Sequence, residues 1–270
     1  MKRITCFHSL TFSALLVGGA LWGQVVPPPP AALVTIPTAG TLQRGQFELE
    51  LLMQTGGSIL GRVGIGLGDR FTLGMSYGVQ KFIGDQKPSL NKAMPEVQLK
   101  YRLYDEGYQM PALVLGLDTQ GRGLFHKDME IISEEDTLIV ARYDIKAVGV
   151  YLVASKNWNM LGNLGTHFGI CKNFLEEDET DQDINFFFGI DKDINPNISA
   201  FMEYNAALDD NEYRFEEISF GQERGYLNAG IRFNVAGNLY MEIDLNDILL
   251  NKGQVKYFSR ELKVVYNEFF

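Results

Sequence analysis

The regular alternation of apolar and polar residues is the feature that most constrains what this chain can fold into. From Gly45 onward the pattern recurs in about twelve segments, each near the length of about nine to eleven residues that a tilted membrane strand needs. Residues 96–104 show it most regularly, with an apolar residue at every second position and a charged or amide residue between. Because successive side chains of a strand point to opposite faces, each segment predicts a ribbon with one apolar and one polar side.

The boundaries of the predicted strands follow from this alternation and from the turn-forming residues between segments. Segment 143–155 leaves its register open, because apolar residues stand on both of its faces. In segment 184–191 we expect Ile184, Phe186, Phe188 and Ile190 to face outward. The predicted strands are residues 46–54, 59–67, 70–80, 96–104, 112–120, 143–155, 164–173, 184–191, 198–205, 226–235, 239–245 and 260–270.

The connections between these strands alternate between short and long. Outer-membrane barrels have an even number of strands, short periplasmic turns and long external loops. The short connections are 68–69, 105–110, 156–163, 191–197 and 236–238, and the long ones are 81–95, 121–142, 174–183, 206–225 and 246–259. Only residues 55–58 place a short connection where a long one is expected. The sequence therefore predicts an all-β, antiparallel transmembrane β-barrel of about twelve strands, of the outer-membrane type. A soluble β-sandwich and an eight-stranded soluble ligand barrel are the alternatives.

The last segment, residues 260–270, is expected to close the barrel by pairing with residues 46–54. Leu262, Val264, Tyr266 and Phe270 fall on its apolar face, and the chain stops on an aromatic residue. We interpret Tyr266 and Phe270 as a C-terminal assembly signal that the barrel assembly machinery reads. Glu268 lies on the same outward row, so we expect it at the membrane interface.

The N-terminal residues predict export to the bacterial outer membrane. Lys2 and Arg3 precede an apolar stretch over residues 10–21, and small residues follow it, which is typical of a secretory signal peptide over residues 1–23. An uncleaved amphipathic anchor is the alternative. The proline-rich residues 24–44 are predicted to form a periplasmic lead-in, because proline cannot join a sheet ladder, and residues 45–270 form the barrel. Whether the lead-in enters the barrel mouth is left open. Cleavage leaves Cys171 as the only thiol, which excludes an intramolecular disulfide.

The charge of the chain excludes some partners. Loss of the signal peptide makes the chain two charges more negative than the −10 of the full sequence, so nucleic acid is not an expected partner. The expected partners are outer-membrane lipid and the barrel assembly machinery, with polysaccharide or other envelope proteins as further candidates. Beyond the signal no apolar run is long enough for a spanning helix.

The polar faces of the predicted strands carry both signs of charge. Mixed charge on facing walls favours pairing across the lumen over an open funnel of one sign. We therefore predict a lumen that is narrowed by charged pairs and by Tyr240 and Phe187. The residues expected to face the lumen are Glu48, Glu50, Arg62, Arg70, Glu96, Lys100, Arg102, Asp118, Glu203, Arg232, Glu242, Asp244, Glu261 and Lys263.

Candidate chemical sites are few. The acidic loop 176–183 fits a divalent-cation role in part, but a solvated loop is the preferred interpretation, because nothing in the sequence fixes ligand geometry. Asp191, Asp193, Asn195 and Asn197 have the spacing of a calcium loop, but Pro196 stands where such a loop needs Gly, so we predict a polar turn. No catalytic, cofactor-binding or metal-binding residue is predicted, and no cofactor is expected.

The two histidines of the mature chain leave an outer-membrane hydrolase as a distant possibility. His126 lies in a long loop, and His167 is predicted to point into the lumen near Cys171. Neither comes with a recognisable nucleophile motif. We interpret His167 as a lumen-packed residue without a positioned partner.

Several stretches resemble one known family. Residues 36–40 leading into Arg44 and Gly45, residues 97–107, 111–113 and 115–121 are similar to segments of the YjbH-like outer-membrane proteins. Residues 155–157, 161–165 and 225–230 resemble recurrent segments of their uncharacterised relatives. The resemblance implies a non-enzymatic barrel, and some members of the family are associated with exopolysaccharide production or export.

The sequence therefore predicts a non-enzymatic outer-membrane barrel that supports envelope structure or exopolysaccharide production and export. A narrow, passive, porin-like channel for small solutes is the alternative. An outer-membrane hydrolase is the third hypothesis.

Overall fold

The computed structural model describes residues 30–132, 137–174, 176, 183–210, 221–252 and 255–270. The predicted signal peptide, residues 1–23, and residues 24–29 of the lead-in lie outside the described residues. No helix among the described residues is long and apolar enough to cross a membrane.

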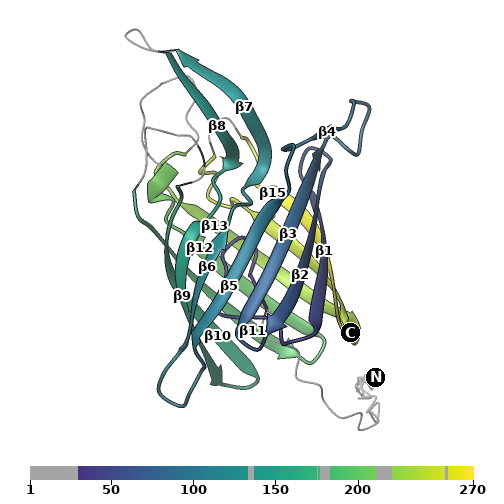
Figure 1. The fold of residues 1–270 in the computed structure, drawn as a ribbon, viewed down its shortest axis with the longest axis vertical. Helices are drawn as coiled ribbons and strands as arrows, with labels where there is room; N and C mark the ends of the chain where they lie inside the picture. The colour runs from purple at the N-terminus through teal and green to yellow at the C-terminus, as the bar shows by residue number, and fades with distance from the viewer. Residues whose placement is uncertain (1–29, 133–136, 175, 177–182, 211–220, 253–254) are drawn as a thin grey trace, which may run out of the picture.

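Twelve antiparallel strands form one closed barrel (Figure 1). Each strand pairs with its neighbours in sequence, apart from the excursions described below, and β2–β3 pairing joins the two ends of the sheet, so the barrel has no open edge. The strands are β1 (Gln46–Gln54), β2 (Ser58–Gly68), β3 (Phe71–Gln80), β5 (Glu96–Tyr104), β6 (Ala112–Asp118), β9 (Gly149–Asn159), β10 (Asn163–Lys172), β11 (Asn185–Asn195), β12 (Ile198–Asn205), β13 (Tyr226–Ala236), β14 (Leu239–Asn246) and β15 (Ser259–Phe269). The predicted fold class and strand number are confirmed.

The outer face of the barrel is apolar. On β11, Phe186, Phe188 and Ile190 are exposed, and the residues between them are buried. The same alternation places exposed Leu, Ile, Val, Met and aromatic side chains on the other barrel strands. A continuous apolar surface of this kind is stable only against lipid, so the chain is a transmembrane barrel of the outer-membrane type.

The first and last strands meet at a regular seam. The register of β1 against β15 runs from Gln46 opposite Phe269 to Met53 opposite Leu262, so the predicted pairing is confirmed. The backbone N–H of Phe270 donates to the carbonyl oxygen of Gly45 at 2.9 Å, and its ring lies 5.0 Å from the ring of Phe47. Backbone pairing and aromatic contact therefore both hold the end of the chain against its first strand.

The rim of the seam accommodates Glu268 and Tyr266. The Tyr266 hydroxyl donates to the Glu268 carboxylate at 2.8 Å, and the Asn238 amide donates to the same carboxylate at 2.7 Å. Glu268 is exposed, as expected for a carboxylate at the membrane interface.

The region between β6 and β9 differs from the prediction. Residues 143–155 are not one strand: they are shared between β8 (Thr137–Ile145) and β9, with residues 146–148 between them. β8 pairs with β7 (Arg122–Ile132), so the predicted loop 121–142 is mostly a β-hairpin outside the barrel (Figure 1). The apolar residues on both faces of 143–155 hid this break, because they belong to two strands with different surroundings.

The long connections lie at one end of the barrel and the short turns at the other. The β7–β8 hairpin and the short strand β4 (Ser89–Leu90) rise from one end, while the C-terminus lies at the opposite end (Figure 1). By the rule for outer-membrane barrels, the end with the long connections is external and the end with the chain terminus is periplasmic.

The structure shows where the lead-in lies, which the sequence left open. Residues 31–42, which we predicted as part of a periplasmic lead-in, lie within the lumen. The backbone near Gln43 crosses β2 at Gly66, next to the periplasmic β2–β3 turn, so the segment leaves the lumen at that end to start β1. The sequence left this position open, because proline excludes the segment from the ladder but does not exclude it from the space that the ladder encloses.

Candidate functional site: the occupied lumen

The inserted segment, residues 31–42, folds back on itself inside the barrel. Ala32 and Pro37 form an isolated antiparallel bridge, and the Leu33 N–H donates to the Ile36 carbonyl oxygen at 3.0 Å. The tip of the segment is therefore a tight turn over residues 33–36. No residue of the segment carries a charge, so its polar groups are backbone amides and threonine hydroxyls.

Glu203 on β12 binds the tip of the inserted segment. Its carboxylate accepts the backbone N–H groups of Val34 at 2.9 Å, Thr35 at 2.8 Å and Ile36 at 3.2 Å. It also accepts the Thr35 hydroxyl at 2.5 Å and the Asn228 amide at 2.7 Å. Glu203 is 1% exposed, so this carboxylate is buried with its charge distributed over five donors. Such a cluster of aligned N–H groups replaces the water that burial removes.

Basic side chains bind the carbonyl oxygens of the same segment. The Lys100 ammonium donates to the carbonyl oxygens of Thr38 at 3.1 Å and Gly40 at 3.2 Å, and also to that of Ala31. The Arg102 guanidinium donates to Ala39 at 3.4 Å. Lys100 and Arg102 both come from β5, where they are two residues apart and face the lumen together.

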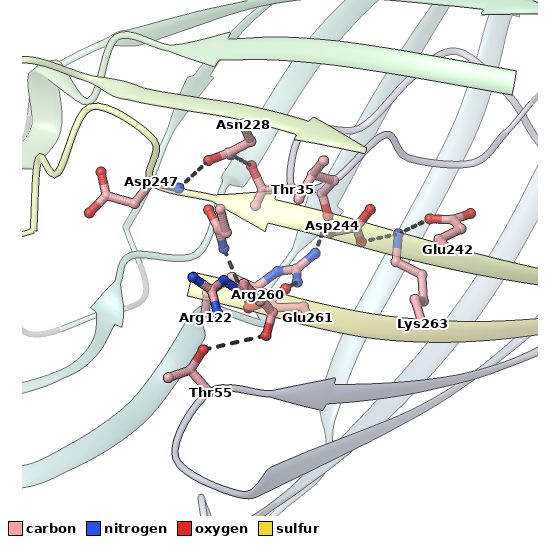
Figure 2. A network of polar contacts seen from close by, with 12 residues as sticks. Thr35, Thr55, Arg122, Asn228, Glu242, Asp244, Asp247, Arg260, Glu261 and Lys263 are labelled. Carbon is pink, nitrogen blue, oxygen red and sulfur yellow. Dashed lines mark hydrogen bonds and ion pairs between the residues drawn. The ribbon is translucent and has the colours of Figure 1, made fainter. Parts of the chain in front are cut away.

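Two further cations bind the tip, one from β15 and one from the base of the β7–β8 hairpin. Lys263 on β15 donates to the Leu33 carbonyl oxygen at 3.1 Å, and Arg122 at the start of β7 donates to that of Val34. Lys263 also contacts Glu242 at 2.6 Å and Asp244 at 3.5 Å, while Arg122 contacts Glu261 at 2.6 Å (Figure 2). The tip is thus connected to a network of charged pairs on β14 and β15.

Apolar packing adds to these polar contacts. Leu33, Val34 and Ile36 are fully buried, and they belong to one cluster with Val114, Val153, Phe187 and Phe201 from the barrel wall. Burial of each such side chain is worth about 1.5–3 kcal/mol. Phe187, which we predicted to narrow the lumen, packs its ring in this cluster around the inserted segment. Tyr240, the other predicted narrowing residue, is buried on β14.

Glycines in the wall make room for the segment. A Cβ atom added to Gly189 would lie 2.5 Å from Cδ1 of Leu33 and 2.7 Å from Cδ1 of Ile36. At Gly66 an added Cβ would lie 1.9 Å from the carbonyl oxygen of Gln43. The tip and the exit of the segment both depend on these two positions having no side chain.

The predicted lumen charges form pairs, mostly between neighbouring strands. Arg232 contacts Glu242 at 2.5 Å between β13 and β14, and Arg62 lies 3.9 Å from Glu50 between β1 and β2. Arg62 also lies 3.7 Å from Asp118 on β6, although β3 and β5 stand between their two strands. Pairing between adjacent strands is favoured because their side chains stand closest, while the inserted segment separates opposite walls.

Two predicted lumen residues have other surroundings. Glu96 is buried at the external end of β5, where it contacts Lys92 at 2.6 Å and accepts the Tyr143 hydroxyl at 3.0 Å. Glu48, by contrast, lies on the same lumen-facing row of β1 as Glu50 and is half-buried. Arg70 is not a lumen residue: it lies in the β2–β3 turn, half exposed, and contacts Asp105 at 2.8 Å on the neighbouring turn. The strand starts one residue later than predicted, and this places Arg70 at the periplasmic rim.

His167 has partners that the sequence did not reveal. Its Nδ1 lies 2.7 Å from Ser155 Oγ, and its Nε2 lies 2.6 Å from Asp191 Oδ1. Ser155 Oγ also accepts the backbone N–H of Ala39 at 2.8 Å. The expectation of a histidine without a positioned partner is wrong, because β9, β10 and β11 bring three residues far apart in sequence side by side. The trio has the composition of a hydrolase triad, yet Ser155 is 5% exposed and bound to the inserted segment, so here the three side chains anchor that segment.

A cavity of about 440 Å³ opens at the external end of the lumen. The cavity is lined by Arg122, which binds the tip of the segment, by its partner Glu261, and by Asp144 on β8. Asp144 accepts the Leu124 N–H at 2.9 Å and contacts His126 at 2.8 Å and Lys252 at 2.7 Å. Burial raises the pKa of Asp144, but the hydrogen bond from His126 and the charge of Lys252 outweigh it and lower the pKa to about 2.

The acidic and calcium-loop segments show no cation site in the described structure. Within the described ranges, no group of three His, Cys, Asp or Glu side chains is placed to hold a metal ion. Asp193 instead accepts the Ser199 hydroxyl at 2.7 Å, and residues 196–197 form the β11–β12 turn, as expected for a polar turn. Of the acidic loop 176–183, residues 177–182 lie outside the described residues.

Comparison with known proteins finds similarity at the level of structure only. No family model and no curated protein matches the sequence. Among solved structures, the KdgM porin is 11% identical, with a TM-score of 0.48, over 83% of this chain and 99% of that chain. The same porin in complex with disordered oligogalacturonate is 12% identical, with a TM-score of 0.46, over 83% and 99% of the two chains. The outer membrane channel DcaP of Acinetobacter baumannii is 10% identical, with a TM-score of 0.31, over 83% and 95%.

Proposed function

We propose that this protein is a non-enzymatic, porin-like barrel of the outer membrane, and that small solutes pass only when residues 31–42 leave the lumen. The observation that carries the proposal is the way the segment is held. Glu203, Lys100, Arg102, Lys263 and Arg122 all bind its backbone, through contacts that water or a polar solute can also make.

The composition of the inner wall supports this interpretation. A small barrel that serves only as a scaffold can fill its interior with side chains from its own strands. Here the inner wall carries ionisable residues, and an uncharged segment that belongs to no strand occupies the space between them. An occupant of this kind can leave without breaking the β-sheet, since it contributes no strand to the ladder.

Single-channel recording in planar bilayers tests the proposal. The purified wild-type protein should show rare, small openings. A variant in which residues 32–37 are replaced by a Gly-Ser sequence of equal length should open often, because it loses the apolar tip. The matched control replaces the six residues 105–110 of the exposed periplasmic β5–β6 turn in the same way and should behave like the wild type. A large, steady conductance of the wild type would contradict the role of the segment, and a silent Gly-Ser variant would contradict the channel.

A second candidate is a permanently sealed barrel that supports envelope structure or exopolysaccharide production and export. The resemblance to YjbH-like proteins suggests it, and the complete burial of Leu33, Val34 and Ile36 favours it, because a tightly packed tip resists displacement. A deletion strain separates the two candidates. Loss of surface polysaccharide with unchanged permeability to small solutes supports the sealed barrel, and the reverse result supports the channel.

A further inference from the structure

The external cavity has the size of a ligand site. It measures about 440 Å³ and is lined by the β1–β2 connection, the β3–β4 loop, the base of the β7–β8 hairpin, and Lys252 and Val255 from the described part of the β14–β15 connection. Pockets that bind small molecules have volumes of about 300–1,000 Å³. Four separate connections therefore build one cavity that is large enough for a small solute.

The charges in the lining balance. Its basic residues are Lys81, Arg122 and Lys252, and its acidic residues are Asp85, Asp144 and Glu261. Two of the acids already have basic partners within the lining, since Arg122 lies 2.6 Å from Glu261 and Lys252 lies 2.7 Å from Asp144. A lining without net charge gives no advantage to an anion or a cation.

The remaining lining offers hydrogen bonds of both kinds and small apolar surfaces. Gln54 and Asn246 both line the cavity, and Nε2 of Gln54 and Oδ1 of Asn246 have no hydrogen-bond partner in the described part of the chain. Ile83, Leu124 and Val255 supply apolar contacts beside them. Donors, acceptors and apolar carbon together match a solute that carries several hydroxyl groups on a carbon framework.

The cavity lies on the route to the inserted segment. Arg122 donates to the Val34 carbonyl oxygen of the tip and also lines the cavity together with its partner Glu261. Figure 2 shows Arg122 and Glu261 side by side, near Lys263 and its acidic partners. A solute that enters from outside therefore reaches this cavity before it meets the segment.

We propose that the external cavity is a binding site for a neutral, hydroxyl-rich solute of the size of a mono- or disaccharide. The ligand supplies hydroxyl partners to the Gln54 and Asn246 amides, whose Nε2 and Oδ1 atoms are buried without a partner in the described part of the chain, and packs its carbon framework against Leu124. Binding does not require the segment to move, so this proposal stands independently of the channel. Conductance tests the channel, and equilibrium binding tests the site.

Isothermal titration calorimetry of the full-length protein tests the site. Maltose is the neutral probe, and maltobionate, its carboxylate counterpart, is the charged probe. The protein is kept in a detergent without a sugar headgroup, so that the detergent does not occupy the cavity. We expect saturable binding of maltose in the millimolar range and weaker binding of maltobionate.

Two variants and one control locate the binding. Leu124→Trp fills the cavity and should abolish the saturable heat, whereas Asn246→Ala should weaken binding about tenfold, the loss expected for one or two hydrogen bonds. Met110→Trp, on an exposed periplasmic turn, should bind like the wild type. If the wild type gives no saturable heat with maltose, or if both cavity variants bind it unchanged, the site is wrong. Tighter binding of maltobionate would overturn the neutral ligand class.

Discussion

The outer and inner walls of the barrel are built from the same twelve strands but on different principles. Outside, apolar residues recur with little distinction between positions, because every one of them meets the same lipid. Inside, ionisable residues have particular partners: Glu203 binds three successive N–H groups, while Lys100 binds three carbonyl oxygens. The outer wall therefore tolerates exchange among apolar residues, whereas the inner wall depends on particular side chains.

The largest expected effect concerns the seam where the two walls close. Deletion of Phe270 removes the N–H that donates to Gly45 and the ring that contacts Phe47. We expect the amount of barrel in the outer membrane to fall several-fold, because an incomplete seam leaves backbone groups unpaired in lipid. The heat-modifiable band on gels of outer-membrane fractions measures it. Neutral replacement of the acids in residues 176–183 is the control, and equal membrane levels of the two variants would contradict the prediction.

Lys263→Met tests the inner wall most directly. Lys263 is 3% exposed and holds Glu242, which is fully buried. Removal of one partner of a buried pair costs about 3–5 kcal/mol, and Arg232 on the other side of Glu242 should keep the loss near the lower figure. The free energy of unfolding in urea, measured in micelles, checks it. Lys81→Met in an exposed loop is the control and should change little. Equal losses for both variants would mean that the inner wall tolerates substitution as the outer wall does.

Gly189→Ala tests how tightly the inner wall packs against the tip of the inserted segment. The added methyl group meets Leu33 and Ile36, which are fully buried and cannot move aside freely. Overpacking of this kind costs about 1–3 kcal/mol, and we expect more frequent channel openings in planar bilayers. Gly61→Ala is the matched control, because nothing lies within 4 Å of its added Cβ. Identical recordings from the two variants would show that the tip does not close the lumen.

Asp144, which lies on the external hairpin outside the membrane, should make the stability of the protein depend on pH. Its pKa is lowered from 3.8 to about 2, so its contribution to stability is fully present above about pH 4 and is lost as the pH falls through about 2. A shift of this size corresponds to about 2 kcal/mol. Between about pH 6 and about pH 2, the melting temperature of the wild type should show a decline that Asp144→Asn lacks. Parallel curves for the two proteins would remove Asp144 as the cause.

Arg70→Ala should have the smallest effect. Arg70 and Asp105 are both more than half exposed at the periplasmic rim, and an exposed pair contributes less than about 1 kcal/mol. Urea unfolding should therefore differ little from the wild type. A loss as large as that for Lys263→Met would return Arg70 to the inner wall, where the sequence pattern placed it.

The strands that form the wall of the barrel could be predicted from the sequence alone. Period-two alternation depends only on the opposite faces of a strand and on the contrast between lipid and lumen, both of which are local in the chain. It therefore predicted the strand number, the seam between β1 and β15, and the inward register of residues such as Glu203, Lys263 and Glu242. Residues 122–145 escaped this reasoning, because the same alternation forms an external hairpin as readily as a barrel strand.

The segment that the wall encloses could be identified only from the tertiary structure. Nothing local in residues 31–42 distinguishes a segment in the periplasm from one inside the barrel, since most of its side-chain partners lie 60 or more residues away in the sequence. The contacts of His167 with Ser155 and Asp191, and the external cavity with its balanced charges, likewise arise when separate strands and loops meet. A closed sheet brings distant residues onto one inner surface, and that surface exists only after the sheet has closed.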